Sequence, residues 1–291
     1  MHIRKARVAG QFYPDQHDLC INLIYELLET ITFDGILPET ISGGIIPHAG
    51  WVFSGSLEGL FFSVLKQKYE KIQTFILLGA AHSYFGSMPA IYDKGFWETP
   101  LGQIAIDEDL AGVILRTESV VSDLKAHQSE HSIEVQVPFI QYFFPDSKIL
   151  PILVPPNNKS IVLGESIGTI ISNESDKKIV LAGSTDLTHY GPGYSFIPMG
   201  IGQQSLQWAH EVNDKKFIDT ALKMDPSELL ACAAENGNAC GPGAAAAVIS
   251  AVKKLGSEKG FLLAHTNSNE ILQKSYGKAS SESVGYATII F

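Results

Sequence analysis

Short apolar runs that alternate with longer helix-like segments are the feature that most constrains how this chain can fold. Residues 43–47, 74–79, 148–154 and 178–183 form such runs, and glycine or proline lies at one end of each. Short, continuous apolar runs are typical of strands that are buried on both faces of a sheet. The alternation therefore predicts an α/β fold, with a mostly parallel or mixed central sheet and helices on both faces.

Helical patterns fill the stretches between and after these runs. Asp107 and Asp225 stand where a helix N-cap is favoured, and Pro138 must kink its helix or lie in the first turn. Because no internal repeat, low-complexity tract or long linker interrupts the chain, we expect a single domain over residues 1–291. The expected helices are 54–69, 107–116, 132–144, 160–172, 206–224, 227–235 and 242–255, and the closing strands are 261–265 and 284–290.

The charge balance and the cysteine content limit the function classes. The chain has 21 Lys and Arg against 31 Asp and Glu, a formal net charge of −10, which argues against a nucleic-acid partner. Three cysteines are too few for a disulfide framework. Since the sequence shows neither a secretory signal nor an apolar stretch of membrane-spanning length, we expect a cytoplasmic protein without a membrane partner.

Polar residues of one kind follow three of the predicted strands. His48 follows the first run, and His82 follows the second. Asp186 and His189 follow the fourth run. Ligands of open α/β sheets bind beyond the carboxyl ends of the strands, so parallel neighbouring strands would bring these four side chains into one crevice. A lone buried histidine is more often a hydrogen-bonded core residue, but the repetition favours a shared site, and imidazole with carboxylate suits iron, zinc or copper.

Cys240 is the candidate for an anionic metal ligand. It directly precedes a predicted helix, and a helix N-terminus favours the thiolate, so we expect this thiol to ionise more readily than a free one. Gly241 and Gly243 would allow the backbone to approach its neighbours closely. Cys20 and Cys232 lie in amphipathic or apolar stretches and fit small residues of the core.

Two interpretations apply to residues 127–139, where His131 and Glu134 are spaced to share one helix face. These side chains would either support a metal site by orienting a ligand imidazole or mark the start of a surface helix, with Glu130 near its positive end. The patterns of a dinucleotide-binding loop, a phosphate-binding loop and a serine nucleophile elbow are absent from the sequence.

Five motifs in this order resemble the Memo family: PHAGWVFSG, GAAHS, EHSIEVQVPF, STDLTHYG and ACGPG. Bacterial and archaeal members of that family are known as protein B of the AmmeMemoRadiSam system. The resemblance extends from VAGQFYP to SVGYATIIF, over nearly the whole chain. It implies a fold like that of the class III extradiol dioxygenases, which are non-haem Fe(II) enzymes. It also implies radical SAM and AMMECR-type pathway partners.

Residue by residue, the resemblance implies that His48, His82 and Cys240 bind the metal. It implies catalytic roles for Asp186 and His189, and His189 falls where the dioxygenases hold a general base. Those enzymes use a carboxylate as third ligand, whereas this chain offers a thiolate, which is softer and alters both metal preference and redox potential. Iron (Fe²⁺) is the expected cofactor, and copper and zinc are the alternatives.

Three functions follow as hypotheses. The leading one is an iron-dependent oxidoreductase resembling the extradiol dioxygenases, in which His189, assisted by Asp186, moves a proton of a chelating substrate. The second is a non-catalytic binding or scaffold protein whose pocket takes a small molecule, a peptide or a protein partner. The third is zinc-dependent hydrolysis, although the sequence contains no His-Glu-x-x-His motif.

Overall fold

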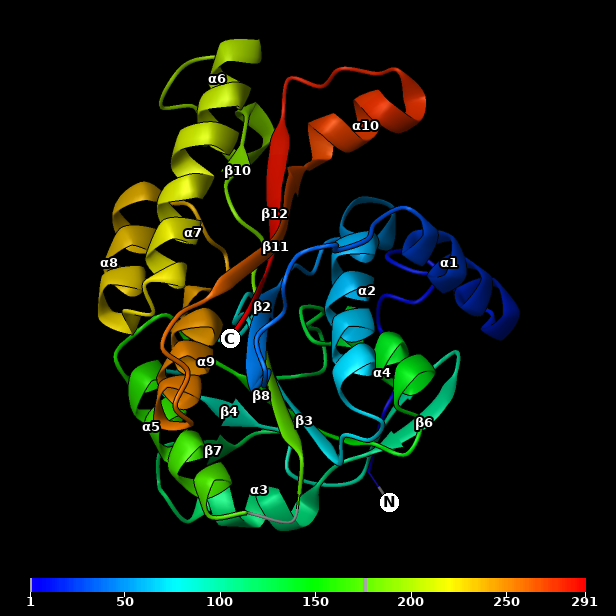
Figure 1. Cartoon of the computed structure of the whole chain (residues 1–291), viewed down its shortest axis with the longest axis vertical. Helices are drawn as coiled ribbons and strands as arrows, with labels where there is room; N and C mark the ends of the chain where they lie inside the picture. Colours follow the sequence, from blue (N-terminus) through cyan, green and yellow to red (C-terminus); the bar gives the residue numbers. More distant parts are fainter. Residues whose placement is uncertain (1, 175–176) are drawn as a thin grey trace.

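A nine-stranded sheet runs through the computed structural model, which describes residues 2–174 and 177–291 (Figure 1). In hydrogen-bonded order its strands are β10 (His189–Tyr190), β12 (Ser283–Ile290), β2 (Gly43–Ile46), β9 (Ile179–Ser184), β3 (Thr74–Gly79), β8 (Lys148–Leu153), β4 (Ala90–Ile91) and β7 (Val121–Ser122), and β11 (Phe261–Asn267) pairs with β12 outside this path. The four middle strands β2, β9, β3 and β8 are parallel, whereas β12 and β4 run antiparallel to their inner neighbours.

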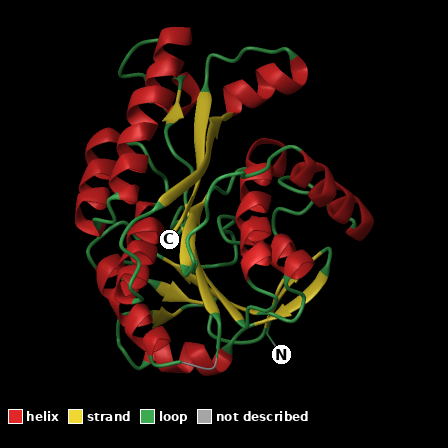
Figure 2. Ribbon diagram, viewed as in Figure 1, coloured by secondary structure: helices red, strands yellow, loops and turns green. Residues whose placement is uncertain are grey.

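Helices cover both faces of this sheet (Figure 2). On one side lie α1 (His17–Glu29), α2 (Trp51–Lys68) and α4 (Val137–Phe143), and on the other lie α5 (Lys159–Ser172), α7 (Lys215–Leu222), α8 (Pro226–Asn236) and α9 (Pro242–Lys254). The remaining helices are α3 (Glu108–Leu115), α6 (Gln203–Trp208) and α10 (Ser268–Tyr276). The predicted α/β fold with a mixed central sheet is confirmed. Among the helices that the structure describes, none has the length and apolarity needed to cross a bilayer.

Most predicted elements are present with small shifts at their ends, and two differ in kind. The predicted helix 132–144 opens with a 3₁₀ turn (Glu134–Gln136), and Pro138 lies in the first turn of α4. The predicted helix 206–224 is divided by a π-helix (Ala209–Asp214) between α6 and α7. Asp107 and Asp225 cap α3 and α8 through their carboxylates, as predicted. The sequence patterns indicated neither α10 nor a second sheet, formed by β1 (Ile3–Arg4), β5 (Phe96–Thr99) and β6 (Gly102–Ala105).

Small residues allow α9 to pack closely against the sheet and against α5. Residues 244–247 are alanines with fully buried side chains. A Cβ atom on Gly183 of β9 would lie 2.7 Å from Val248, and one on Gly164 of α5 would collide with the carbonyl oxygen of Ala247. The absence of side chains at these glycines therefore brings the N-terminus of α9 beside the end of β9.

A buried ion pair fixes the N-terminal segment to the loop that precedes α4. Arg4 Nη1 lies 2.7 Å from Glu134 Oε2, and both side chains are almost fully buried. Arg4 also donates to the carbonyl oxygens of His127 and Glu130, and Glu134 Oε1 accepts the backbone N–H of Val8. Glu134 is thus a buried support of this loop and does not lie on a surface helix.

We expect Gly164→Ala to destabilise the protein by about 1–3 kcal/mol, because the added methyl group overpacks the contact between α5 and α9. Gly112→Ala in α3 is the matched control: its Cβ would meet only an Arg116 nitrogen, at 3.9 Å. Because alanine favours a helix more than glycine, this control should be neutral or stabilising by up to about 1 kcal/mol. Urea unfolding measures both variants, and equal destabilisation would contradict the packing argument.

Glu134→Gln is expected to cost about 3–5 kcal/mol of unfolding free energy, because Arg4 then remains buried without a counter-charge. The control is Glu98→Gln, which removes the carboxylate of an exposed pair with Lys5. That change should leave the thermal midpoint unchanged, since exposed ion pairs contribute little. A thermal midpoint of Glu134→Gln equal to that of the wild type would show that the buried pair does not hold the segment.

Candidate metal centre

The ends of three parallel strands bring the predicted site residues to one edge of the sheet. β9 lies between β2 and β3 and is parallel to both, which confirms the adjacency that the sequence argument required. His48 follows β2, His82 follows β3, and Asp186 and His189 follow β9. Because these strands end on the same side, residues more than 130 positions apart, such as His48 and Asp186, come into hydrogen-bond contact.

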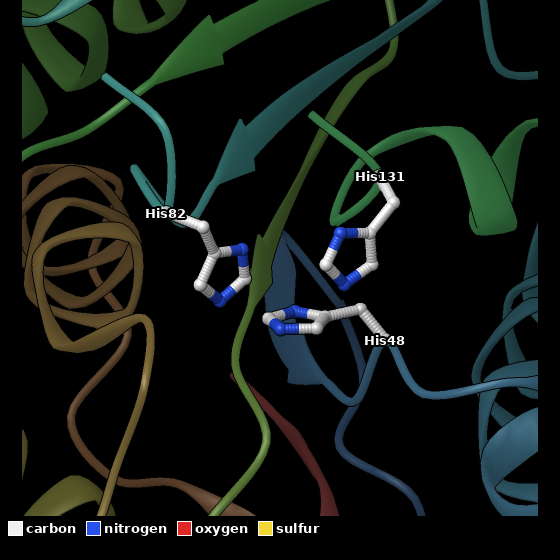
Figure 3. Close-up of side chains that lie close together, drawn as sticks. All are labelled: His48, His82 and His131. Atoms are coloured by element: carbon white, nitrogen blue, oxygen red, sulfur yellow. The ribbon is translucent and has the colours of Figure 1, made fainter. Parts of the chain in front are cut away.

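Three imidazoles face one another beyond these strand ends (Figure 3). The ring centroids of His48 and His82 lie 5.1 Å apart, and those of His48 and His131 lie 5.5 Å apart. The rings of His82 and His131 are nearly parallel, with centroids 5.0 Å apart. One donor nitrogen of each ring lies within 4.8 Å of the others. His131, from the loop before α4, therefore belongs to the cluster.

A hydrogen-bond network sets the tautomer of His48. The Ser184 hydroxyl donates to the Ser132 carbonyl oxygen at 2.7 Å and accepts from Gln136 Nε2 at 2.8 Å. His48 Nδ1, 2.6 Å from the Ser184 oxygen, must therefore donate its proton. This leaves the lone pair of His48 Nε2 free on the side of Cys240, whose Sγ lies 3.1 Å away. Burial lowers the pKa of His48 well below its usual value, so the ring is neutral and able to bind a metal.

Glu130 holds the other two histidines in place. Its Oε1 accepts from His82 Nδ1 at 2.9 Å and from the backbone N–H groups of His131 and Ser132, and its Oε2 accepts the backbone N–H of His82. Burial alone would raise the pKa of Glu130, but the hydrogen bond and the charge of His82 outweigh it and lower the pKa to about 2. The carboxylate thus binds the Nδ1–H of His82 and leaves its Nε2 free, the arrangement found behind metal-binding histidines.

Cys240 lies directly before α9 and contacts both His48 and Asp186. Its Sγ accepts the backbone N–H of Asp186 at 3.2 Å, and its own N–H donates to the Asp186 carbonyl oxygen at 3.2 Å. Gly241 permits this approach, because a Cβ there would collide with the Ser184 carbonyl oxygen. The expectation that this thiol ionises readily is wrong: burial, and then the charge of Asp186, raise the pKa of Cys240. Thiolate formation here requires a cation as partner.

A cavity of about 330 Å³ opens beside the imidazoles and includes His131, Asp186 and His189 in its wall. His189 Nε2 is buried without a hydrogen-bond partner among the described residues, and burial lowers the pKa of His189 to about 4. Asp186 Oδ1 accepts the backbone N–H of His48 at 2.7 Å, and burial raises the pKa of Asp186 to about 7. This volume suits a small molecule. Aromatic lining comes from Phe12, Phe53, Tyr194 and Tyr286.

The structure places the predicted metal ligands in two groups that share His48. One group adds His82 and His131, and the other adds Asp186 and Cys240, with donor atoms within 4.8 Å of one another in each. Within residues 2–174 and 177–291, no such group contains both His82 and Cys240. His131 was predicted only as a support or a surface residue. The sequence feature that could have indicated His131 as a ligand is its position directly after Glu130. Because the Glu130 carboxylate orients His82, the next residue, His131, also lies beside His82.

The donor set fits a transition-metal ion. His48 and His82 each have one nitrogen bound to a protein acceptor, which leaves the other nitrogen to bind a metal. Although burial opposes it, the hydrogen bond and charge of Glu130 raise the pKa of His82, so a metal at His82 Nε2 would displace a proton. Imidazole and thiolate donors suit iron, copper and zinc. Since the donors around a tetrahedral ion lie roughly 3.4 Å apart for bonds near 2.1 Å, donor atoms within 4.8 Å of one another need only small side-chain movements to share one ion.

Comparison with known proteins agrees with the motifs. The model of a family described as Memo-like protein matches residues 4–290. Relatives named MEMO1 family protein include one from Thermococcus onnurineus, 33% identical over 99% of each chain, and one from Methanosarcina acetivorans, 36% identical over 100% of this chain and 99% of the relative. A solved structure of an uncharacterized Escherichia coli K12 protein shares the fold, with a TM-score of 0.52 and 11% identity, covering 87% of this chain and 100% of that one. The chain belongs to the Memo family.

Proposed function

We propose that this Memo family member is a mononuclear non-haem metal protein whose metal is held by His48, His82 and Cys240. His131 is proposed as the fourth donor. The observation that carries the proposal is the convergence of three imidazoles whose donor nitrogens lie within 4.8 Å of one another. Because His48 Nε2 is also 3.1 Å from Cys240 Sγ, His48 connects the three imidazoles to the thiol.

Iron(II) is the proposed metal, and oxidation of a small substrate is the proposed activity. The ligand types accept iron, copper and zinc, and the likeness of the motifs to a family related to the extradiol dioxygenases favours iron. When bound, the iron would supply a Lewis acid and a redox centre for a chelating substrate and O₂. Radical SAM and AMMECR-type proteins are proposed as pathway partners on the family resemblance alone.

The protein's own groups would position the substrate and accept its proton. His189 belongs to the cavity wall, its ring is neutral because burial lowers its pKa, and its Nε2 has no hydrogen-bond partner among the described residues. This nitrogen would accept a proton from an acidic hydroxyl of a ligand there. Asp186 belongs to the same wall and fixes the backbone of His48. The aromatic rings of Phe12 and Phe53 limit water around the bound ligand.

Protein purified without oxygen should carry about one iron per chain, and His48→Ala/His82→Ala should lose it because two ligands are removed. Plasma mass spectrometry of iron, copper and zinc measures the content. His17→Ala is the matched control, since this exposed imidazole bonds to Asp18 and lies outside the site. Iron content unchanged in the double variant would count decisively against the proposed centre.

The same preparations distinguish the third ligand and the function class. In copper-loaded protein, Cys240→Ser should abolish the thiolate-to-copper charge-transfer band, whereas Cys232→Ser should leave it intact.

The function class is tested by O₂ uptake. Uptake that rises and falls with iron content supports the oxidoreductase. Ligand binding that persists in the metal-free His48→Ala/His82→Ala variant would instead support a binding module.

Glu130→Gln should weaken metal affinity by about 10–100-fold, because a neutral amide replaces the carboxylate that orients His82. Competition with a chromophoric chelator measures this affinity. Asp18→Asn, which changes an exposed carboxylate that bonds a histidine outside the site, is the control and should have no effect. A wild-type affinity in Glu130→Gln would mean that the hydrogen bond to His82 does not support the metal.

A further inference from the structure

A second cluster of metal-binding side chains lies outside this centre, where the π-helix packs against β12 and the neighbouring β11. It consists of His210 and Asp214 from the π-helix and His265 from β11, with one donor atom of each within 4.8 Å of the others. The proposed oxidoreductase centre uses none of these residues, so the inference below stands independently of it.

We propose that His210, Asp214 and His265 bind a zinc ion. Glu270, in α10, is the fourth ligand. His265 Nε2 lies 3.2 Å from Asp214 Oδ2, and His210 Nε2 lies 3.5 Å from Glu270 Oε1. The two imidazole rings are stacked, with centroids 4.0 Å apart and planes 22° apart. Three donors therefore lie within 4.8 Å of one another, and Glu270 of a third element lies beside one of them.

The burial of these groups favours a ligand over a surface ion pair. The Asp214 side chain is only 1% exposed, and a Cβ on Gly285 of β12 would collide with its carboxylate, so the strand backbone closes over it. Buried charges are paired or bind metals. A cation among these donors would supply the counter-charge that the buried Asp214 carboxylate needs.

The donor types and the backbone point to zinc. Two imidazoles with carboxylates form a common zinc set, whereas magnesium and calcium prefer oxygen ligands alone. The three donors that lie within 4.8 Å of one another need to approach by at most about 1.4 Å to reach tetrahedral spacing. A π-helix is rare and is frequent at functional sites, and here it carries two of the ligands, His210 and Asp214.

Zinc at this site would connect the π-helix to the loop of the first centre. Asp214 Oδ1 accepts the backbone N–H of Thr188 at 2.9 Å, and Asn213 Nδ2 donates to the Thr188 hydroxyl at 3.1 Å. Thr188 lies between Asp186 and His189 in the sequence. Because four protein ligands close a zinc site to substrate, the ion would be structural and would hold this loop in place.

Zinc titration of two proteins followed by equilibrium dialysis tests the inference. A variant without the first centre, His48→Ala/His82→Ala/Cys240→Ser, should retain one zinc per chain, and adding His210→Ala/His265→Ala should remove it. In otherwise wild-type protein, His210→Ala/His265→Ala should lower the zinc stoichiometry by one and leave the iron content unchanged. Cobalt in place of zinc should give the visible bands of a tetrahedral site, which the same two substitutions remove.

Two further variants guard against a folding defect. Glu270→Gln changes a half-exposed ligand and should weaken zinc binding by at least about tenfold without unfolding the protein. His17→Ala, an exposed histidine paired with Asp18, should change nothing. Zinc binding that survives His210→Ala/His265→Ala, or no zinc beyond the first centre in wild-type protein at zinc excess, would overturn the proposal.

Discussion

The parallel pairing of β2, β9 and β3 is the constraint on which the rest of the site depends. Because the three strands end at the same edge, His48, His82 and Asp186 arrive there without any long loop having to fold back. The same pairing determines how α9 packs against the sheet, because Gly183 in β9 leaves room for this helix. Cys240 lies just before α9 and therefore reaches the same edge of the sheet. Fold and site are thus consequences of one arrangement of strands.

Hydrogen bonds behind the imidazoles convert this arrangement into a preorganised donor set. Ser184 fixes one ring nitrogen of His48, and Glu130 fixes one of His82. In each case the second nitrogen is left on the side of the cluster, where it can bind a metal. Both supports are held in place: Ser184 ends β9, and the carbonyl oxygen of Glu130 accepts a hydrogen bond from Arg4. Binding an ion therefore requires little rearrangement of these side chains.

The sequence patterns predicted the strands and the residues that follow them, but they did not predict features that depend on tertiary contacts. Apolar runs located β2, β3 and β9, and so the positions of His48 and His82. His131 was left undetermined, because its place in the cluster follows from the hydrogen bonds of a neighbouring carboxylate. The second sheet escaped prediction because its strands have only two to four residues. The expected easy ionisation of Cys240 is wrong because burial outweighs the helix N-terminus.

The most direct test of the central claim is diffraction from crystals of anaerobically purified protein, with anomalous data collected on both sides of the iron edge. We expect one anomalous peak within bonding distance of His48 Nε2, His82 Nε2 and Cys240 Sγ, at about 2.0–2.3 Å. Well-ordered histidines with no anomalous scatterer between them, or an iron peak elsewhere in the molecule, would contradict a metal centre at this edge of the sheet.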